Sequence, residues 1–333
     1  MTAATRLAEA WYRPRLTVST ALLVPLSWLY GGVVRARRRL YALGILQVHR
    51  IARPVVVIGN LTVGGGGKTP ATIALARALA TRGAVPGIVS RGYGGRATAP
   101  RRVAANDDPA QVGDEALLLA GTGFPVVVGR DRVAAAQALI DADPRCTVIL
   151  SDDGLQHLAL ARDVEIVVID TTRGFGNGHL LPAGPLREPA ARIADADAIV
   201  RVGVTGPVSG DGRESVVVHH VLPWRRVVDD AENAEVASAW RGLRVHAIAG
   251  IANPRRFFDM LASLGIDAAG TPFPDHHAFV ASDLPADADI VLMTQKDAVK
   301  CRRFADARCY YLPIEARLDP RLVERVQKLI GAA

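Results

Sequence analysis

Residues 59–70, with the sequence GNLTVGGGGKTP, combine the residue types that bind the phosphates of a nucleotide. Glycines let successive backbone N–H groups turn toward phosphate oxygens, and a helix that begins directly after them adds the positive end of its dipole. The lysine at the end of such a loop reaches the β- and γ-phosphates, and the following hydroxyl binds Mg²⁺. The residues expected to contact the nucleotide are Thr62, Gly64, Gly65, Gly66, Gly67, Lys68 and Thr69, with Thr62 standing where the strict pattern has its first glycine.

Two adjacent carboxylates, Asp152 and Asp153, follow an apolar run at residues 146–150. A phosphate-binding loop needs an acid at the end of a neighbouring strand, which holds Mg²⁺ directly or through water. A single aspartate in this place is as often a cap or a turn, whereas two beside such a loop favour a metal site. The sequence therefore predicts a nucleoside triphosphate with Mg²⁺, and Thr69, Asp152 and Asp153 as the metal-binding residues.

Phosphate transfer to an alcohol also requires a base, and two motifs could supply one. Asp114 opens a helical stretch in GDE (113–115), and His276 lies in DHH (275–277). A carboxylate that is hydrogen-bonded to an imidazole can accept a hydroxyl proton. Taken alone, Asp114 is better explained as a helix cap and the histidine pair as a surface loop, and the spacing does not bring them together.

Other nucleotide-binding classes fit less well or stay open. A GTPase would carry N/T-K-x-D, but in TQKD (294–297) the aspartate directly follows the lysine. A dinucleotide-binding enzyme would carry G-x-G-x-x-G with an acid about 20 residues later, and four glycines before Lys-Thr fit that pattern poorly. A motor or transport ATPase stays open, because the loop does not identify the phosphate acceptor.

These residues must be positioned by strands and helices that alternate along the chain. Apolar runs typical of buried strands occur at residues 54–59, 85–89, 125–129, 146–150, 164–169 and 198–202, and helical patterns at 69–82, 114–120 and 131–142. This alternation predicts an α/β fold with a P-loop NTPase-like parallel sheet sandwiched by helices. After extended segments near 216–223 and a helical or loop-like stretch at 227–239, a second α/β pattern follows, with strands at 245–249 and 290–294 and helices at 254–264 and 319–330. We therefore expect an N-terminal segment (1–53), a core domain (54–222) and a smaller α/β domain (223–333).

The charge of the chain is concentrated near its N-terminus. The 333 residues include 40 basic and 33 acidic side chains, a net charge of +7, but residues 1–53 hold nine arginines and one glutamate, or +8. The remainder is therefore close to neutral, which argues against a nucleic-acid-binding domain with a basic face. The three cysteines lack the spacing of a zinc site and indicate a reducing compartment without structural disulfides.

Residues 16–34 form an uncharged run of 19 residues between Arg15 and Arg35. A hydrophobic helix here would be barely long enough to cross a membrane, and Pro25 weakens a straight span. Flanking aromatic residues and arginines favour a helix that lies in the cytoplasmic leaflet against anionic phospholipids. A true span and a buried soluble helix stay open.

Eight stretches together resemble the tetraacyldisaccharide 4′-kinase family of lipid A biosynthesis. They are PVVVIGNLTVGGGGKTP (54–70), SRGYGG (90–95), VGDEALLLA (112–120), VVVGRDRVAAA (126–136), SDDGLQH (151–157), RGFGNGHLLPAGPLREP (173–189), FPDHHAF (273–279) and MTQKDAVK (293–300). The resemblance implies transfer of the ATP γ-phosphate to the 4′-hydroxyl of a membrane-bound, tetraacylated glucosamine disaccharide 1-phosphate, forming lipid IVA. It also implies a place on the cytoplasmic face of the inner membrane of a Gram-negative bacterium, and no protein partner is evident.

By motif, the resemblance implies that Asp114 and His276 together activate the acceptor hydroxyl. Lys68 and Thr69 match the phosphate and Mg²⁺ residues, and Asp152 and Asp153 the Mg²⁺-organising acids. Four more residues match family positions with less defined roles, either as active-site neighbours or as contacts to substrate or metal. They are Glu115, His157, Arg187 and Glu188.

The chain departs from the family pattern at three positions. Gly66 replaces a usual Thr or Ser, which removes a phosphate-facing hydroxyl. Ala116 replaces a usual Pro, and Gln295 a usual Glu. None of these removes a residue assigned to chemistry.

Overall fold

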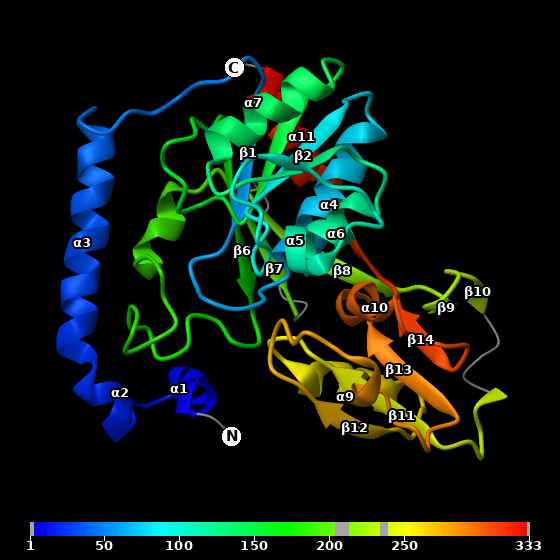
Figure 1. Ribbon diagram of the computed structural model, residues 1–333. Coiled ribbons are helices and arrows are strands. Elements are labelled where there is room, and N and C mark those ends of the chain that lie inside the picture. The colour runs from blue at the N-terminus through cyan, green and yellow to red at the C-terminus, as the bar shows by residue number, and fades with distance from the viewer. Residues whose placement is uncertain (1–2, 204–212, 234–238, 332–333) are drawn as a thin grey trace.

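The computed structural model describes residues 3–203, 213–233 and 239–331. Within these residues, nine strands form one sheet, which runs through the upper part of the molecule in Figure 1. Their order across the sheet is β15 (Ile314–Arg317), β8 (Glu214–Val221), β7 (Ala198–Val202), β6 (Val164–Asp170), β1 (Val55–Gly59), β5 (Val148–Asp152), β2 (Pro86–Ser90), β4 (Val126–Val128) and β3 (Arg101–Arg102). Only the edge strands β3 and β15 pair antiparallel with their neighbours in this sheet. The prediction of a mostly parallel sheet between helices is confirmed.

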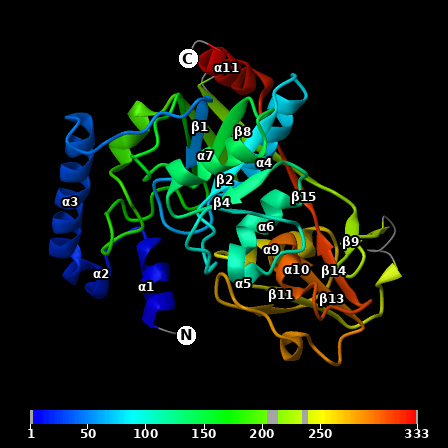
Figure 2. The same cartoon turned by 45° about the horizontal axis from the view of Figure 1, so that its top comes forward.

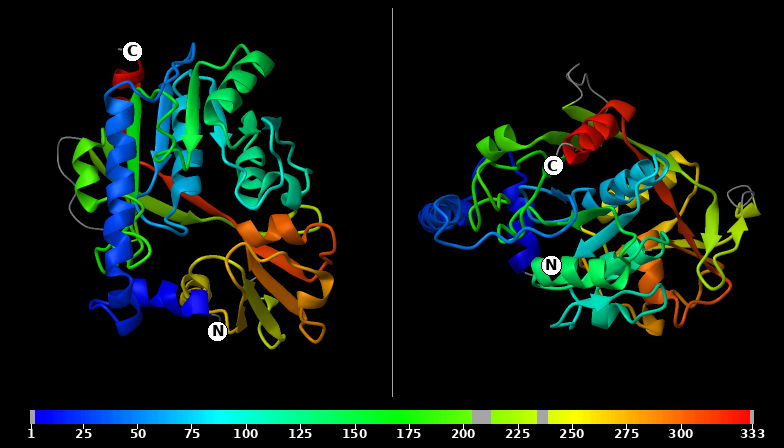
Figure 3. Two further views of the ribbon diagram at one scale, coloured as in Figure 1. Left: turned by 60° about the vertical axis from the view of Figure 1, so that its left-hand side comes forward. Right: turned by 90° about the horizontal axis from the view of Figure 1, so that it is seen from above.

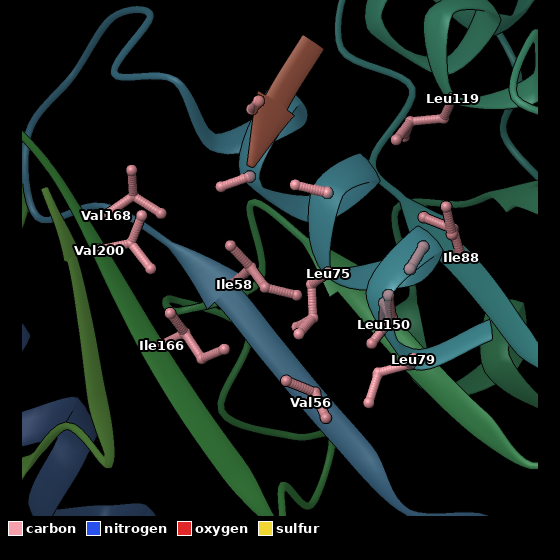
Figure 4. Close-up of a cluster of buried hydrophobic side chains, with 14 of the residues drawn as sticks. Val56, Ile58, Leu75, Leu79, Ile88, Leu119, Leu150, Ile166, Val168 and Val200 are labelled. Carbon is pink, nitrogen blue, oxygen red and sulfur yellow. The ribbon is translucent and has the colours of Figure 1, made fainter. Parts of the chain in front are cut away.

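Helices cover both faces of this sheet, which explains why its strands are apolar without alternation. One face packs against α4 (Lys68–Ala80), α6 (Asp114–Ala120) and α11 (Pro320–Gly331). Figure 4 shows part of this core, where Leu75 and Leu79 of α4 lie over Val56 and Ile58 of β1. The other face packs against α7 (Arg132–Ala142) and the 3₁₀ helix η1 (Ala190–Asp195). A short helix α5 (Pro109–Val112) precedes α6.

A second sheet of six strands in the described residues forms the lower body of the molecule (Figure 1). Its order is β10 (Glu232–Asn233), β9 (Trp224–Arg226), β14 (Cys309–Leu312), β13 (Ile290–Thr294), β11 (Val245–Ala249) and β12 (Ala269–Pro272). Helices α9 (Pro254–Ser263) and α10 (Gln295–Cys301) flank it, with the 3₁₀ helix η2 (Ala281–Asp283). Of the stretch predicted as helical or loop-like, residues 227–233 form a turn and β10, and 234–238 lie outside the described residues.

The chain returns to the first sheet at its C-terminal end, which corrects the assignment of residues 223–333 to one smaller domain. Strand β15 pairs antiparallel with β8 in the nine-stranded sheet. Helix α11 buries an apolar stripe made of Leu322, Val323 and Val326 in the larger core. From sequence order alone, α11 was assigned to the wrong sheet. Its amphipathic pattern predicts a helix but does not indicate which sheet its apolar face will cover.

The N-terminal segment forms three helices, α1 (Ala3–Trp11), α2 (Val18–Leu22) and α3 (Val24–Ala42). The expected single helix over the uncharged run is wrong, because Pro25 lies in the first turn of a new helix that continues through the arginine cluster. A proline is tolerated there because the N–H it lacks has no partner within the helix. Figures 2 and 3 show α3 along the outer edge of the larger body. In the described part of the chain, no helix has both the length and the apolar character needed to cross a membrane.

Candidate active site

The glycine loop links β1 to α4 at the carboxyl edge of the larger sheet. Gly64 and Gly67 adopt positive φ angles of 93° and 81°, a backbone conformation that residues other than glycine disfavour. Lys68 Nζ is buried and donates to Asn60 Oδ1 at 3.3 Å and to the Gly64 carbonyl at 3.4 Å. The loop is therefore held in a folded-back shape by the lysine that the sequence predicts to bind phosphate.

Asn60, which sequence reasoning missed, also explains the departure at Gly66. Its side-chain amide donates to Thr62 Oγ1 and to the Gly64 carbonyl, both at 3.4 Å. A Cβ at Gly66 would stand 2.9 Å from the nitrogen of this amide. The missing side chain thus leaves room for Asn60 to bridge the loop.

The two predicted metal acids lie beside this loop because β5 pairs directly with β1, with Asp152 opposite Ile58. Asp152 is fully buried and accepts hydrogen bonds from Thr69 Oγ1 at 3.2 Å and from Thr72 Oγ1 at 2.9 Å. Burial is the main reason that the pKa of Asp152 is raised to about 7, with further contributions from Glu115 and Asp153. Thr72, one turn after Thr69 on α4, is a second residue that the motif did not identify.

Asp153 faces cations instead of hydroxyls. Its carboxylate lies 3.6 Å from Lys68 Nζ and accepts from Arg187 Nη1 at 3.1 Å. These charges outweigh burial and lower the pKa of Asp153. Arg187 reaches this position because residues 185–187 run beside the glycine loop, where Leu186 and Thr62 form an antiparallel bridge.

The residues at this edge fit Mg²⁺, which prefers oxygen ligands and keeps several waters and phosphate oxygens in its shell. Thr69, Asp152 and Asp153 present one hydroxyl and two carboxylates. Among the described residues, no group of three or more His, Cys, Asp or Glu side chains is arranged to enclose a metal ion. A metal bound by these oxygens would have positions left in its shell for phosphate oxygens and water.

The Asp114 and His276 side chains, 162 residues apart, meet across the two bodies. His276 Nδ1 lies 3.0 Å from both carboxylate oxygens of Asp114. Asp114 begins α6 after Gly113, whose φ is 88°, and His276 itself has a φ of 59° in the loop after β12. Helix α10 of the smaller sheet packs on α6, and this contact holds the two elements together.

The surrounding charges and burial shift the pKa values of both residues of this pair. Burial alone would raise the pKa of Asp114, but His276, Lys296 and Lys300 together lower it. Burial and Lys296 act to lower the pKa of His276, but the hydrogen bond to Asp114 and the nearby carboxylates raise it overall. The neighbouring His277 points elsewhere, since its Nε2 lies 3.0 Å from Asp283.

The two remaining predicted residues, Glu188 and His157, lie in different surroundings. Glu188 is buried, accepts from Gln156 Nε2 at 2.9 Å and pairs with Arg38 of α3 at 2.7 Å. Gln156 in turn accepts from Arg187 at 3.2 Å, so polar contacts connect α3 to Asp153. His157 Nε2 accepts from the backbone N–H of Arg132 at 3.2 Å, and burial, with the charge of Arg132, lowers the pKa of His157 to about 4.

The other two departures do not change the Asp114–His276 pair itself. Ala116 is buried in the larger core. Gln295 is exposed at the first residue of α10, whereas the next residue, Lys296, contacts Glu115, Asp275 and His276. Lys296 is a third residue that sequence reasoning missed, although it lies in the stretch MTQKDAVK (293–300) that resembles the family.

The chain is similar to known proteins over nearly its whole length. The family model described as "Tetraacyldisaccharide-1-P 4′-kinase" matches residues 19–331. The tetraacyldisaccharide 4′-kinase of Chromobacterium violaceum is 50% identical over 330 residues, which cover 95% of each chain. That of Alkalilimnicola ehrlichii is 52% identical over 308 residues, which cover 92% of this chain and 91% of the relative.

A solved structure agrees with these relatives. The crystal structure of LpxK from Aquifex aeolicus in complex with ATP matches with a TM-score of 0.80 and 28% identity, covering 94% of this chain and 100% of that chain. Sequence and architecture therefore agree along both sheets. The chain belongs to the tetraacyldisaccharide-1-P 4′-kinase family of kinases.

Proposed function

We propose that this kinase transfers the γ-phosphate of ATP to the 4′-hydroxyl of a tetraacylated glucosamine disaccharide 1-phosphate, forming lipid IVA. The observation that carries the proposal is the Asp114–His276 pair, which two separate bodies build next to the glycine loop and its acids. Glu115, adjacent to Asp114, is close enough to Asp152 to raise its pKa. The names of the relatives and the ATP bound to the Aquifex aeolicus structure support this substrate pair.

The glycine loop and Lys68 bind and orient the triphosphate. Backbone N–H groups of residues 64–69 and the N-terminal end of α4 would face phosphate oxygens, and the Lys68 ammonium would leave Asn60 and Gly64 to meet them. Thr69, Asp152 and Asp153 would hold Mg²⁺, which supplies neutralisation of the phosphate charge when bound. Arg187, already paired with Asp153, adds a second cation beside the phosphates.

The Asp114–His276 pair would accept the proton of the 4′-hydroxyl. As the oxygen forms its bond to the γ-phosphorus, the bond from that phosphorus to the β,γ-bridging oxygen breaks and ADP leaves. The proton passes to the pair, where the lowered pKa of Asp114 keeps the carboxylate ionised and ready to accept. Asp114 is buried and His276 partly so, which limits the contact of the pair with water.

The N-terminal helices would bring the enzyme to its lipid substrate. Large apolar side chains on α2 and α3 are exposed, including Val18 (81%), Leu22 (77%), Trp28 (71%) and Leu29 (66%), and arginines lie close to them in sequence. An exposed apolar face with flanking arginines is typical of a helix that lies in the surface of an anionic membrane. We infer that residues 1–53 associate with the cytoplasmic face of the inner membrane, and that Ser27, Tyr30 and Arg38 hold α3 to the catalytic body.

Transfer can be measured with purified protein, radiolabelled ATP, Mg²⁺ and the lipid disaccharide monophosphate in detergent micelles. We expect label in the lipid, its loss in Lys68→Met, and its retention in Lys328→Met, which changes an exposed lysine of α11. Release of inorganic phosphate without labelled lipid would refute the proposal and favour an ATPase.

A further inference from the structure

Lys296 places its ammonium group among the acids of the catalytic pair. Its Nζ lies 3.3 Å from Glu115 Oε1 and 3.2 Å from Asp275 Oδ1. It also lies 3.4 Å from His276 Nε2 and 3.9 Å from Asp114 Oδ2. The side chain is only 15% exposed, so these contacts are not those of a freely moving surface lysine. The surrounding carboxylates outweigh burial and raise the pKa of Lys296, which keeps the group charged.

The hydrogen-bonding capacity of this ammonium restricts His276. A charged lysine has three donors and no acceptor, so His276 Nε2 can pair with it only through its lone pair. The proton of a neutral ring must then be on Nδ1, where it is donated to Asp114. Lys296 therefore selects one tautomer of His276 and opposes a second proton on the ring.

The ionised carboxylate of Asp114 also favours the proton on Nδ1, because it can only accept. The other groups near His276 do not oppose a second proton on the ring. Tyr93 packs its ring 4.9 Å from the imidazole, and Asp275, on the same loop, favours the protonated form. Lys300 is directed to Asp297 at 2.7 Å and to the Phe279 ring at 4.9 Å, and approaches only the Asp114 side of the pair. Of the described cations, Lys296 is thus the one in contact with Nε2 of His276, which also lies 3.7 Å from Asp275 Oδ2.

Lys296 also connects the two bodies. It belongs to α10 of the smaller sheet, whereas Glu115 belongs to α6 of the larger one. The same charge that orients His276 therefore favours the arrangement in which His276 and Asp114 meet.

We propose that Lys296 is a positioning residue for phosphate transfer, which opposes a second proton on His276, favours the proton of the neutral ring on Nδ1 and holds the smaller body against Asp114. This inference rests on the proposed function, since it assigns the state in which the Asp114–His276 pair accepts the proton of the acceptor hydroxyl.

The test compares Lys296→Met and Lys296→Arg with Lys328→Met and the wild type. The readouts are pH profiles of kcat and kcat/KM, and the titration of His276 followed by NMR of histidine ring protons, with His276→Gln assigning the signal. Without the cation, His276 should hold its second proton to higher pH, by about one pH unit. The acidic limb of the activity of Lys296→Met should move upward by the same amount, with a loss of at most about tenfold at pH 7 that becomes smaller at pH 9. Lys296→Arg should restore most of the profile.

Three results separate the possibilities. An unchanged His276 titration and acidic limb in a folded Lys296→Met protein would overturn the proposal. A loss that is equal at every pH and is not rescued by arginine would also overturn it, since it would indicate only a packing role. Wild-type protein that fails to label the lipid would refute the proposed function instead, and the NMR titration would still test the effect of Lys296 on His276.

Discussion

Replacing Asp152 by asparagine should stabilise the ligand-free protein while it removes kinase activity. The carboxylate is fully buried, and mainly for this reason its pKa is raised from 3.8 to about 7. The folded state therefore binds the proton more tightly than the unfolded state. Ionised Asp152 destabilises the fold at pH values above 7, and this cost shrinks as the pH falls from 7 toward 4. Asparagine keeps the size of the side chain but has no charge to desolvate.

The expected size follows from the two pKa values. Their difference of about 3 corresponds to roughly 4 kcal/mol above pH 7, at about 1.4 kcal/mol for each pKa unit. At pH 5.5 roughly half of this cost remains. The amide must also re-form the hydrogen bonds from Thr69 and Thr72, so we expect a gain of about 2–4 kcal/mol at pH 8 and a clearly smaller one at pH 5.5.

Urea unfolding in EDTA at both pH values measures this difference, with Asp267→Asn, an exposed carboxylate, as the matched control. The control should change stability by less than about 0.5 kcal/mol at either pH. A less stable Asp152→Asn protein at pH 8, or an equal gain at both pH values, would refute the argument that desolvation of this carboxylate dominates.

Three further predictions concern the core, the base and the membrane surface. Gly87→Ala should destabilise the fold by about 1–3 kcal/mol in urea unfolding, because a Cβ there would stand 2.4 Å from a methyl carbon of Leu139. Asp114→Asn should lower kcat by about 10²–10⁴ in the lipid-labelling assay while the KM for ATP changes little. The double variant Trp28→Ser with Leu29→Ser should bind anionic phospholipid vesicles at least about tenfold more weakly in sedimentation, since both side chains are exposed on α3.

Each of these has a matched control. Gly32→Ala on α3, where a Cβ would meet nothing within 4 Å, should not destabilise the fold. Asp267→Asn should keep full kcat. Val228→Ser, which removes an exposed apolar side chain from the smaller body, should leave vesicle binding unchanged. If a control variant shows the same change as its test variant, the explanation given for that test variant is wrong.

The structure of the glycine loop could be predicted because it is local. The residues of 59–70 are neighbours in the chain, and a strand, a glycine turn and a helix place Lys68 and Thr69 without help from distant segments. The adjacency of Asp152 was also accessible, since parallel strands end at one edge of a sheet and β5 pairs with β1. The spacing and number of apolar residues likewise predicted most strands and helices of the larger body.

Which sheet an element would join could not be predicted in the same way. The pattern of α11 predicts a helix with one apolar stripe, but both bodies offer an apolar face, and only packing decided that α11 covers the larger one. The same holds for α3, whose uncharged residues indicated a hydrophobic helix. Its docking depends on single contacts such as Arg38 with Glu188, 150 residues away.

The sequence by itself determined the glycine loop and the acids beside it, because those groups are positioned by chain neighbours and by strand pairing. Only the tertiary structure decided the partner of Asp114 and its surroundings. His276 and His277 have nearly the same local sequence, yet the positive φ of His276 and the packing of α10 on α6 bring one ring to Asp114 and leave the other on Asp283. Lys296 acquires a role for the same reason, since its charge matters only where the fold collects Asp114, Glu115 and Asp275 around it.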